Sequence, residues 1–187
     1  MPSSPFGPRL RALRQSRGLT LPALAIAAGI TKGYLSKIEH SAQPPTFSTL
    51  QALAAALGAD VGELLQPREG GSSSANIEIH KPDEADWQAA EKLGGYHFLP
   101  LLRSYRNKYL SPFLMRVPRG TTAYFRHDGE EFLYVVKGEI EIEYERRRHA
   151  LKAGGSAYLD SRRRHRFHNR GGTPAMLLAV NFVYRRF

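Results

Sequence analysis

Two histidines and one glutamate are the side chains of this sequence best suited to bind a metal ion or a polar ligand. His127 and Glu131 lie four residues apart in Gly120–Gly138, which reads as a strand, a polar turn and a second strand, and His165 follows in a later strand. Two histidines and one carboxylate can hold iron at a site with open positions. A histidine beside a carboxylate is also stable without a metal. These residue types predict a metal site, a ligand pocket or a polar part of a protein core.

The stretches that carry these residues have the periodicity of β-strands. Ile140, Ile142 and Tyr144 alternate with glutamates, which predicts a strand with one buried and one solvated face. Many short strands separated by glycine and proline turns are typical of a β-sandwich or barrel. Strands are expected at 77–79, 98–102, 112–117, 131–144, 157–159, 165–168 and 176–184.

Residues 1–66 have helical periodicity instead. Leucines recur at helical spacing, Gly18 and Gly29 suit the ends of helices, and Thr20 and Thr31 suit N-cap positions. A small all-α bundle is therefore expected, with helices near 9–17, 21–28, 32–40, 47–57 and 61–65.

A helix, a glycine break and a second helix with a polar outer face are typical of a helix-turn-helix. The stretches GLTLPALA (18–25) and AGITKGYLSKIE (28–39) resemble the Xre type, which has the fold of the lambda repressor DNA-binding domain, and the resemblance covers residues 7–66. It implies that the second motif helix reads the major groove of double-stranded operator DNA. A helical bundle without a DNA role is the alternative. The residues implicated at that helix are Thr31, Lys32, Gly33, Tyr34, Ser36 and Lys37, and Arg9 and Thr20 are expected to contact phosphates.

One position departs from the Xre pattern. Many members carry a polar residue directly after the cap of the first motif helix, where this chain has Leu21. Because a leucine side chain cannot bond to a phosphate, one backbone contact to DNA is expected to be missing.

The segment 67–76 separates the helical pattern from the strand pattern. It contains two glycines and three serines in a row, a composition typical of a flexible linker. We therefore predict an α+β protein of two domains, with an all-α domain at 1–66, a linker at 67–76 and an all-β domain at 77–187.

A second resemblance concerns the all-β part. Gly120–Gly138, followed by GGSAYLDS (154–161) and HRFHN (165–169), resembles the two motifs of the cupin barrel, a jelly-roll fold, with the core at about 95–185. The resemblance implies that His127, Glu131 and His165 occupy three of the four metal-ligand positions of that family. The remaining histidine position holds Phe125, which cannot ligate a metal. A divalent metal and a metal-free effector pocket formed by Phe125, His127, Glu131 and His165 therefore both stay open.

Composition limits the partners and the compartment. The net charge is +10, which favours a polyanionic partner, although residues 1–66 contribute only +3 of it. The chain has no cysteine, no apolar run long enough to span a membrane and no secretory signal pattern, so a cytoplasmic protein is expected.

The two resemblances together imply a transcriptional regulator of the Xre-cupin class. We expect a homodimer that binds a two-fold operator and an effector in the barrel that shifts DNA affinity. The alternatives are a cupin metalloenzyme fused to a DNA-binding domain and a scaffold whose barrel only dimerises. If the side chain of Arg116 faces inward, an anionic effector is favoured.

Overall fold

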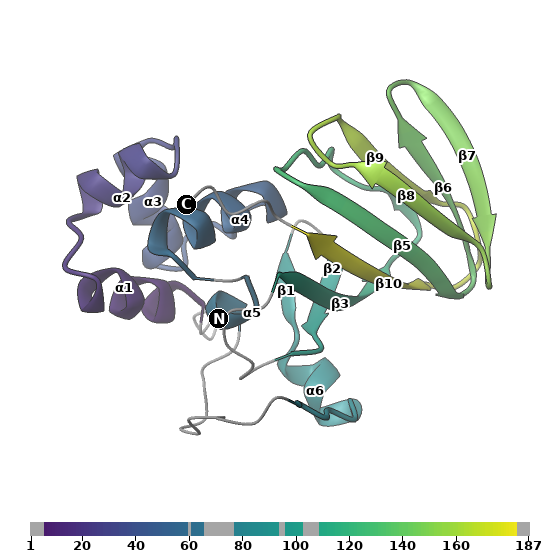
Figure 1. The fold of residues 1–187 in the computed structure, drawn as a ribbon, viewed down its shortest axis with the longest axis horizontal. Helices are drawn as coiled ribbons and strands as arrows, with labels where there is room; N and C mark the ends of the chain where they lie inside the picture. Colours follow the sequence, from purple (N-terminus) through teal and green to yellow (C-terminus); the bar gives the residue numbers. More distant parts are fainter. Residues whose placement is uncertain (1–5, 60, 66–76, 94–95, 103–108, 183–187) are drawn as a thin grey trace. The chain divides into compact units, whose positions relative to one another are not determined.

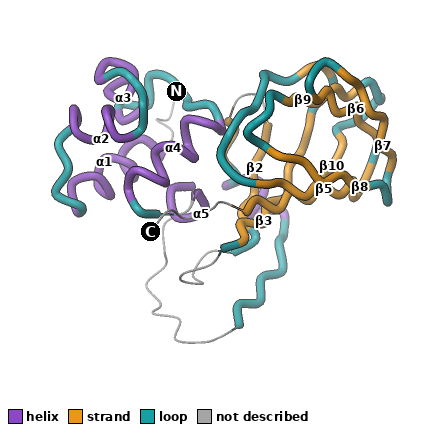
Figure 2. The backbone as a smooth tube through the Cα atoms, turned by 45° about the horizontal axis from the view of Figure 1, so that its top comes forward, coloured by secondary structure: helices purple, strands orange, loops and turns teal. Residues whose placement is uncertain are grey.

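The computed structural model describes residues 6–59, 61–65, 77–93, 96–102 and 109–182. The chain divides into two compact units, Met1–Ser72 and Ser73–Phe187. Helices form the first unit and two β-sheets form most of the second, as Figure 1 and Figure 2 show. This confirms the predicted α+β class with an N-terminal all-α and a C-terminal all-β part. The segment predicted as a linker lies outside the described residues.

The helices of the first unit begin at threonine caps. Thr20, Thr31 and Thr46 each have extended backbone angles, and each side chain accepts a hydrogen bond from the backbone N–H three residues later. A hydroxyl at this position satisfies one of the free N–H groups of the first turn, which fixes where the helix starts. The helices are α1 Phe6–Ser16, α2 Leu21–Ala27, α3 Lys32–Glu39, α4 Phe47–Leu57 and α5 Val61–Leu65.

Leucines at helical spacing hold this unit together. The fully buried side chains include Leu10 of α1, Leu24 of α2, Leu35 of α3 and Leu53 of α4. Each comes from a different helix, so the apolar faces of the four helices meet in a single core.

The described part of the second unit contains one short helix and ten strands in two sheets. The larger sheet has the order β1-β2-β3-β10-β5-β8, and the smaller has the order β4-β9-β6-β7. Neighbouring strands within each sheet pair in antiparallel orientation. The elements are α6 Glu84–Ala89, β1 Glu91–Leu93, β2 Tyr96–Pro100, β3 Leu110–Val117, β4 Gly120–Thr121, β5 Glu130–Lys137, β6 Glu139–Tyr144, β7 Arg147–Lys152, β8 Ser156–Asp160, β9 His165–Asn169 and β10 Ala175–Phe182.

Aromatic rings join the two sheets from inside. Phe125, which bridges to β9, packs 5.3 Å from the ring of Tyr96 in the larger sheet and 5.6 Å from the ring of Phe167 in the smaller one. Burial alternates along β5 and β10, so every second side chain of these strands points into this interior.

One local prediction is wrong, and one helix was not predicted. Residues 77–79 form no strand, and Ile77 and Ile79 are exposed, since no strand of the described chain pairs with them. Helix α6 was not predicted, although Asp83 and Asp86 form a capping box at its start.

Arg116 does not face the interior. Its guanidinium stacks 3.9 Å from the ring centroid of Trp87 and lies 3.8 Å from Glu84. Arg116 therefore gives no support to an anionic effector in the barrel interior. Among the described residues, no helix combines the length and apolar character needed to span a membrane.

Candidate functional site

Helix α3 presents a polar surface that starts at a capped N-terminus. The hydroxyl oxygen of Thr31 accepts a hydrogen bond from the backbone N–H of Tyr34 at 3.1 Å. Leu35 and Ile38 turn into the core, so the opposite side of the helix is left to solvent. On that side the structure brings together the predicted contacts Lys32, Gly33 and Lys37, which are exposed, and Tyr34 and Ser36, which are half-buried.

A buried ion pair that the sequence did not reveal holds this helix against α1. The Arg14 guanidinium donates to both carboxylate oxygens of Glu39, at 2.6 and 3.0 Å, and to the Leu19 carbonyl at 2.8 Å. The Glu39 carboxylate raises the pKa of Arg14 through this hydrogen bond, against the opposing effect of burial. The pair therefore ties the C-terminal end of α3 to α1 and to the turn before α2.

Arg9 is engaged inside its own unit. Its guanidinium donates to the Leu65 carbonyl at 2.6 Å and to the Leu64 carbonyl at 3.5 Å, at the C-terminal end of α5. A cation at this end also interacts favourably with the helix dipole. Thr20, by contrast, is exposed and caps α2 through a hydrogen bond from Ala23 N–H at 3.2 Å.

His127, Glu131 and His165 meet in the interior between the two sheets. Nε2 of His165 lies 3.2 Å from Oε2 of Glu131, and Nε2 of His127 lies 3.7 Å from the same oxygen. One possible ligand atom from each residue lies within 4.8 Å of the others. The three side chains are between 1% and 5% exposed, so the cluster is closed to solvent in this conformation.

Backbone pairing brings these residues together from distant parts of the chain. Phe125 and His165 exchange two backbone hydrogen bonds, at 2.7 and 3.1 Å, and the His127 N–H donates to the Ser161 carbonyl at 2.9 Å. Glu131 lies on β5, where side chains alternate between the two faces of the sheet. Glu131 points inward, and its neighbour Phe132 points outward.

The cluster favours a carboxylate beside a protonated histidine. Burial raises the pKa of Glu131, but the neighbouring imidazoles of His127 and His165 outweigh this effect and lower the pKa to about 2. Burial lowers the pKa of His165, but Glu131 and the Arg163 carbonyl outweigh it and raise this pKa. The buried carboxylate is thus ionised at neutral pH, as a metal ligand must be.

Phe125 lies beside this cluster as an apolar wall. Its ring is buried, and its centroid is 5.7 Å from that of His165. The structure therefore brings together all four residues predicted for the pocket, and only three of them offer ligand atoms.

Two further polar side chains of this interior were missed. Asn181 is the β10 partner of Glu131, and neither its amide nitrogen nor its amide oxygen has a hydrogen-bond partner in the described chain. The Tyr96 hydroxyl is likewise unpaired there, and burial raises its pKa. A signal existed for Asn181, because it interrupts the inward apolar positions of β10.

Glu131 Oε2 and His165 Nε2 also lack a partner with hydrogen-bond geometry among the described residues, despite their 3.2 Å separation. Nearly all buried polar groups in folded proteins are paired. A group of unpaired polar atoms in one interior is therefore typical of a site that meets a ligand. The orphaned oxygen and nitrogen, with His127 beside them, form a donor set that fits a divalent metal.

Both units match known protein families. Residues 5–66 match the helix-turn-helix domain family, and residues 113–181 match the cupin domain family. The uncharacterized HTH-type transcriptional regulator RghRB of Bacillus subtilis is 35% identical over 115 residues, which are 58% of this chain and 81% of that protein. This chain belongs to the HTH-type transcriptional regulators. The regulator therefore binds DNA through its first unit and carries a cupin domain as its second.

Two other similarities cover nearly the whole regulator. A crystal structure of an HTH_3 family transcriptional regulator from Vibrio cholerae has a TM-score of 0.69 and 19% identity, over 98% of this chain and 97% of that one. The (S)-2-hydroxypropylphosphonic acid epoxidase of Streptomyces wedmorensis is 28% identical over 192 residues, which are 96% of each chain. The first similarity concerns the fold, and the second is to an enzyme.

Proposed function

We propose that the regulator reads its operator with helix α3 and senses a small molecule or metal ion with the interior of its cupin domain. The sensing half is supported by the buried polar atoms of Tyr96, Glu131, His165 and Asn181 that have no hydrogen-bond partner in the described chain. The DNA-binding half of the proposal is supported by the match to the helix-turn-helix family and by the similarity to an HTH-type regulator.

The proposed DNA contacts follow from exposure and donor chemistry. Lys32 and Lys37 are exposed cations that can reach guanine edges or phosphates, and Thr20 and Thr31 stand at helix N-termini that favour phosphate. Tyr34 and Ser36 can contact the backbone or a base edge, and Gly33 allows close approach. Arg9 ranks last among the proposed contacts because the carbonyls of α5 already engage its guanidinium.

A divalent metal fits the interior cluster. His127, Glu131 and His165 would hold it, and such an ion would polarise a polar effector bound at its open positions. Tyr96 and Asn181 would then supply a hydroxyl and an amide for the effector's own polar groups. Because Phe125 stands in place of a fourth ligand, a bound ion would have a coordination position free for the effector, beside an apolar surface.

The proposed homodimer has a candidate surface in the cupin domain. Phe132, Tyr134 and Val136 point outward from β5 and are between 38% and 45% exposed. Their cross-strand neighbours on β10 include Val180 and Leu178, which are half-buried. Contiguous exposed apolar residues of this kind are typical of a protein interface. A two-fold dimer matches a two-fold operator. We propose a cytoplasmic location because the operator DNA of a chromosomal regulator lies there.

The test is a thermal-shift screen of the full chain with Fe²⁺, Mn²⁺, Ni²⁺, polyamines, amino acids, sugars and carboxylates. Anything that binds the folded state raises the melting temperature according to its concentration and Kd. We expect a hit that the variant Glu131→Gln loses and that the control Glu139→Gln, on the exposed face of β6, retains. The hit should also change operator affinity, whereas basal operator affinity should be the same in all three proteins.

Two results would count against the proposal. A hit without any effect on operator binding would remove the sensing role. Loss of basal operator binding in a well-folded Glu131→Gln protein would show that the cluster supports the DNA-binding unit instead.

A metalloenzyme is the second candidate function, because the cluster has the ligand types of a catalytic iron site and a relative of similar length is an epoxidase. We propose the non-enzymatic sensor first because Phe125 removes one ligand of the family's metal site. Stoichiometric metal in the purified protein, together with multiple turnovers of an organic substrate, would reverse this order.

A further inference from the structure

We propose that a cavity on the outer face of the smaller sheet is a binding site for a phosphate-type oxyanion. The cavity has a volume of about 550 Å³. It lies where β4 pairs with β9, and Arg148 of β7 reaches it across β6. Its lining consists of Arg119, Gly120, Thr121, Arg148, Arg166, His168, Asn169 and Arg170. Four of these eight residues are arginines and none is acidic.

Strand alternation puts these side chains outside the domain. On β9, His165 and Phe167 point into the interior, so Arg166 and His168 point away from it. On β6, Ile140 and Ile142 are buried inward, and Glu141 and Glu143 therefore share the outer face with the arginines. The cavity and the interior cluster thus lie on opposite faces of β9, and the inference does not depend on the proposed effector site.

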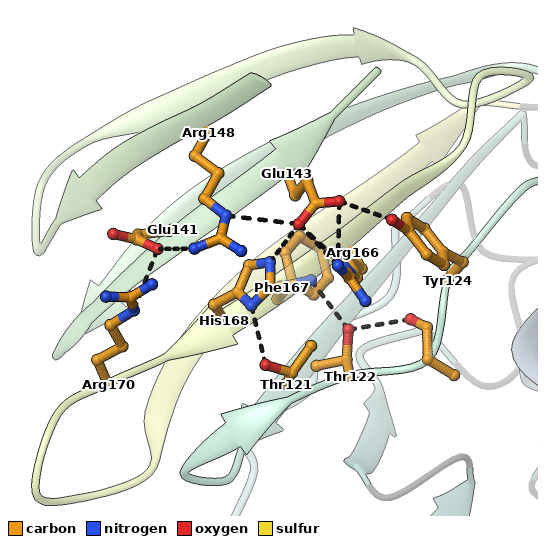
Figure 3. A network of polar contacts seen from close by, with 11 residues as sticks. Thr121, Thr122, Tyr124, Glu141, Glu143, Arg148, Arg166, Phe167, His168 and Arg170 are labelled. Atoms are coloured by element: carbon orange, nitrogen blue, oxygen red, sulfur yellow. Dashed lines mark hydrogen bonds and ion pairs between the residues drawn. The ribbon is translucent and has the colours of Figure 1, made fainter. Parts of the chain in front are cut away.

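A buried carboxylate fixes the guanidinium groups in place. Glu143 accepts hydrogen bonds from the Tyr124 hydroxyl at 2.6 Å, from Arg166 at 2.9 to 3.1 Å and from His168 Nε2 at 2.8 Å (Figure 3). Arg148 Nε lies 3.5 Å from the same carboxylate. Side chains held in this way lose less conformational entropy when they bind an anion.

A second carboxylate holds the other side of the network. Glu141 Oε2 lies 3.3 Å from Arg170 and 3.7 Å from Arg148 (Figure 3). Neither Glu141 nor Glu143 lines the cavity. The carboxylates therefore orient the arginines without closing the space in front of them.

The charge balance of this face favours an anion. Four arginines are opposed by two glutamates, which leaves an excess of two positive charges with His168 counted as neutral. The described chain offers no hydrogen-bond or ion-pair partner to Arg119, which is exposed. A ligand with about two negative charges would balance the face.

The neutral residues of the lining are suited to an oxyanion as well. The Thr121 hydroxyl lies 2.9 Å from Nδ1 of His168, which is buried, and Thr121 itself is exposed at the cavity. Gly120 has a φ of 121°, and nothing lies within 4 Å of the position of a Cβ there. Planar guanidinium groups and a hydroxyl are the donors with which proteins bind phosphate.

Two sources can supply this chemistry, a free phosphorylated small molecule or the phosphate backbone of DNA. The volume of the cavity matches a single small ligand. The two sources are separated by experiment, with inorganic pyrophosphate as the small-molecule probe.

The first experiment titrates pyrophosphate into the full-length protein by calorimetry at fixed ionic strength. Arg119→Glu is the test variant, because removal of an exposed arginine without a partner leaves the fold intact. Arg147→Glu is the matched control, since Arg147 is an exposed arginine of β7 outside the lining. We expect saturable binding that Arg119→Glu weakens by about ten-fold or more, the effect of losing one charge-assisted hydrogen bond. Arg147→Glu should leave the Kd within about two-fold.

The second experiment measures operator affinity of the same proteins over a range of salt concentrations. If the phosphate belongs to DNA, Arg119→Glu should reduce the slope of log K against log salt concentration by about 1, and Arg147→Glu should not. Pyrophosphate binding with unchanged slopes identifies a free small ligand. Equal losses in the two variants, or neither pyrophosphate binding nor a change of slope, would overturn the proposed site.

Discussion

Phe125 decides the chemistry of the cupin interior. Its ring packs against His165 and Tyr96 where a ligating histidine would complete a four-ligand set with His127, Glu131 and His165. The chain therefore keeps three ligand atoms and replaces the fourth with apolar surface.

We expect the variant Phe125→His to bind divalent metal more tightly than the wild type, by about ten-fold or more, because a fourth nitrogen enters the coordination sphere. Competition with a chromophoric chelator would measure the affinity for Mn²⁺ or Ni²⁺. Phe125→Leu is the control that removes the ring without adding a ligand, and its metal affinity should stay near the wild-type value. Equal affinities of all three proteins would mean that position 125 does not face the ion.

At the scale of helices, the approach of α1 to α3 depends on a single glycine. A Cβ at Gly7 would lie 2.6 Å from the carbonyl oxygens of Ile38 and Glu39 and from the Ser41 hydroxyl. Backbone oxygens cannot rotate away, so a methyl group at this position would force the two helices apart.

We expect Gly7→Ala to lower the free energy of unfolding by about 1–3 kcal/mol, the usual cost of overpacking. Gly33→Ala is a matched control, since Gly33 also lies in the first turn of a helix and has nothing within 4 Å of its Cβ position. It should be neutral or slightly stabilising. Urea denaturation of both variants provides the comparison, and equal effects would contradict the close packing.

The ion pair between α1 and α3 leads to another prediction. Arg14→Met leaves the buried Glu39 carboxylate without its bidentate partner and should cost about 3 kcal/mol of stability. The double variant Arg14→Met with Glu39→Met should recover most of this loss, because no buried charge remains. Denaturation of both variants and of Glu39→Met completes a double-mutant cycle, and additive losses would show that the two residues do not act together.

The elements were predicted from the sequence more completely than the contacts between them. Threonine caps and glycine ends are local signals, so the helices of the first unit could be located from neighbouring residues. The interior cluster was predicted because His127 and Glu131 are close in sequence and because the resemblance to the two cupin motifs added His165. The Arg14–Glu39 pair, Tyr96 and the arginine-lined cavity depend on residues that only the tertiary fold brings together, and no local spacing indicates them.

At the scale of the whole molecule, the exposed apolar face of β5 and β10 bears on the proposed homodimer. Phe132 lies between Tyr158 of β8 and Val180 of β10 in the strand register. A charge placed there would have to be buried by any partner that covers this face.

We expect Phe132→Glu to shift the regulator from dimer to monomer in analytical ultracentrifugation and to weaken operator binding, since a monomer holds only one half-site. Ile79→Glu is the control, because Ile79 is an exposed apolar residue outside the sheets. A Phe132→Glu protein that remains dimeric would move the interface to another surface.

The alternation of side chains along β9 has a consequence for insertions and deletions in related proteins. His165 and Arg166 are consecutive but serve opposite faces, and a shift of register by one residue would exchange all the side chains of the strand between the two faces. Insertion of a single amino acid between His165 and Arg166 would thus turn either His165 or the residues from Arg166 to Asn169 to the wrong face. In an alignment of homologues, gaps should be absent from 165–169 even where the amino acids there differ.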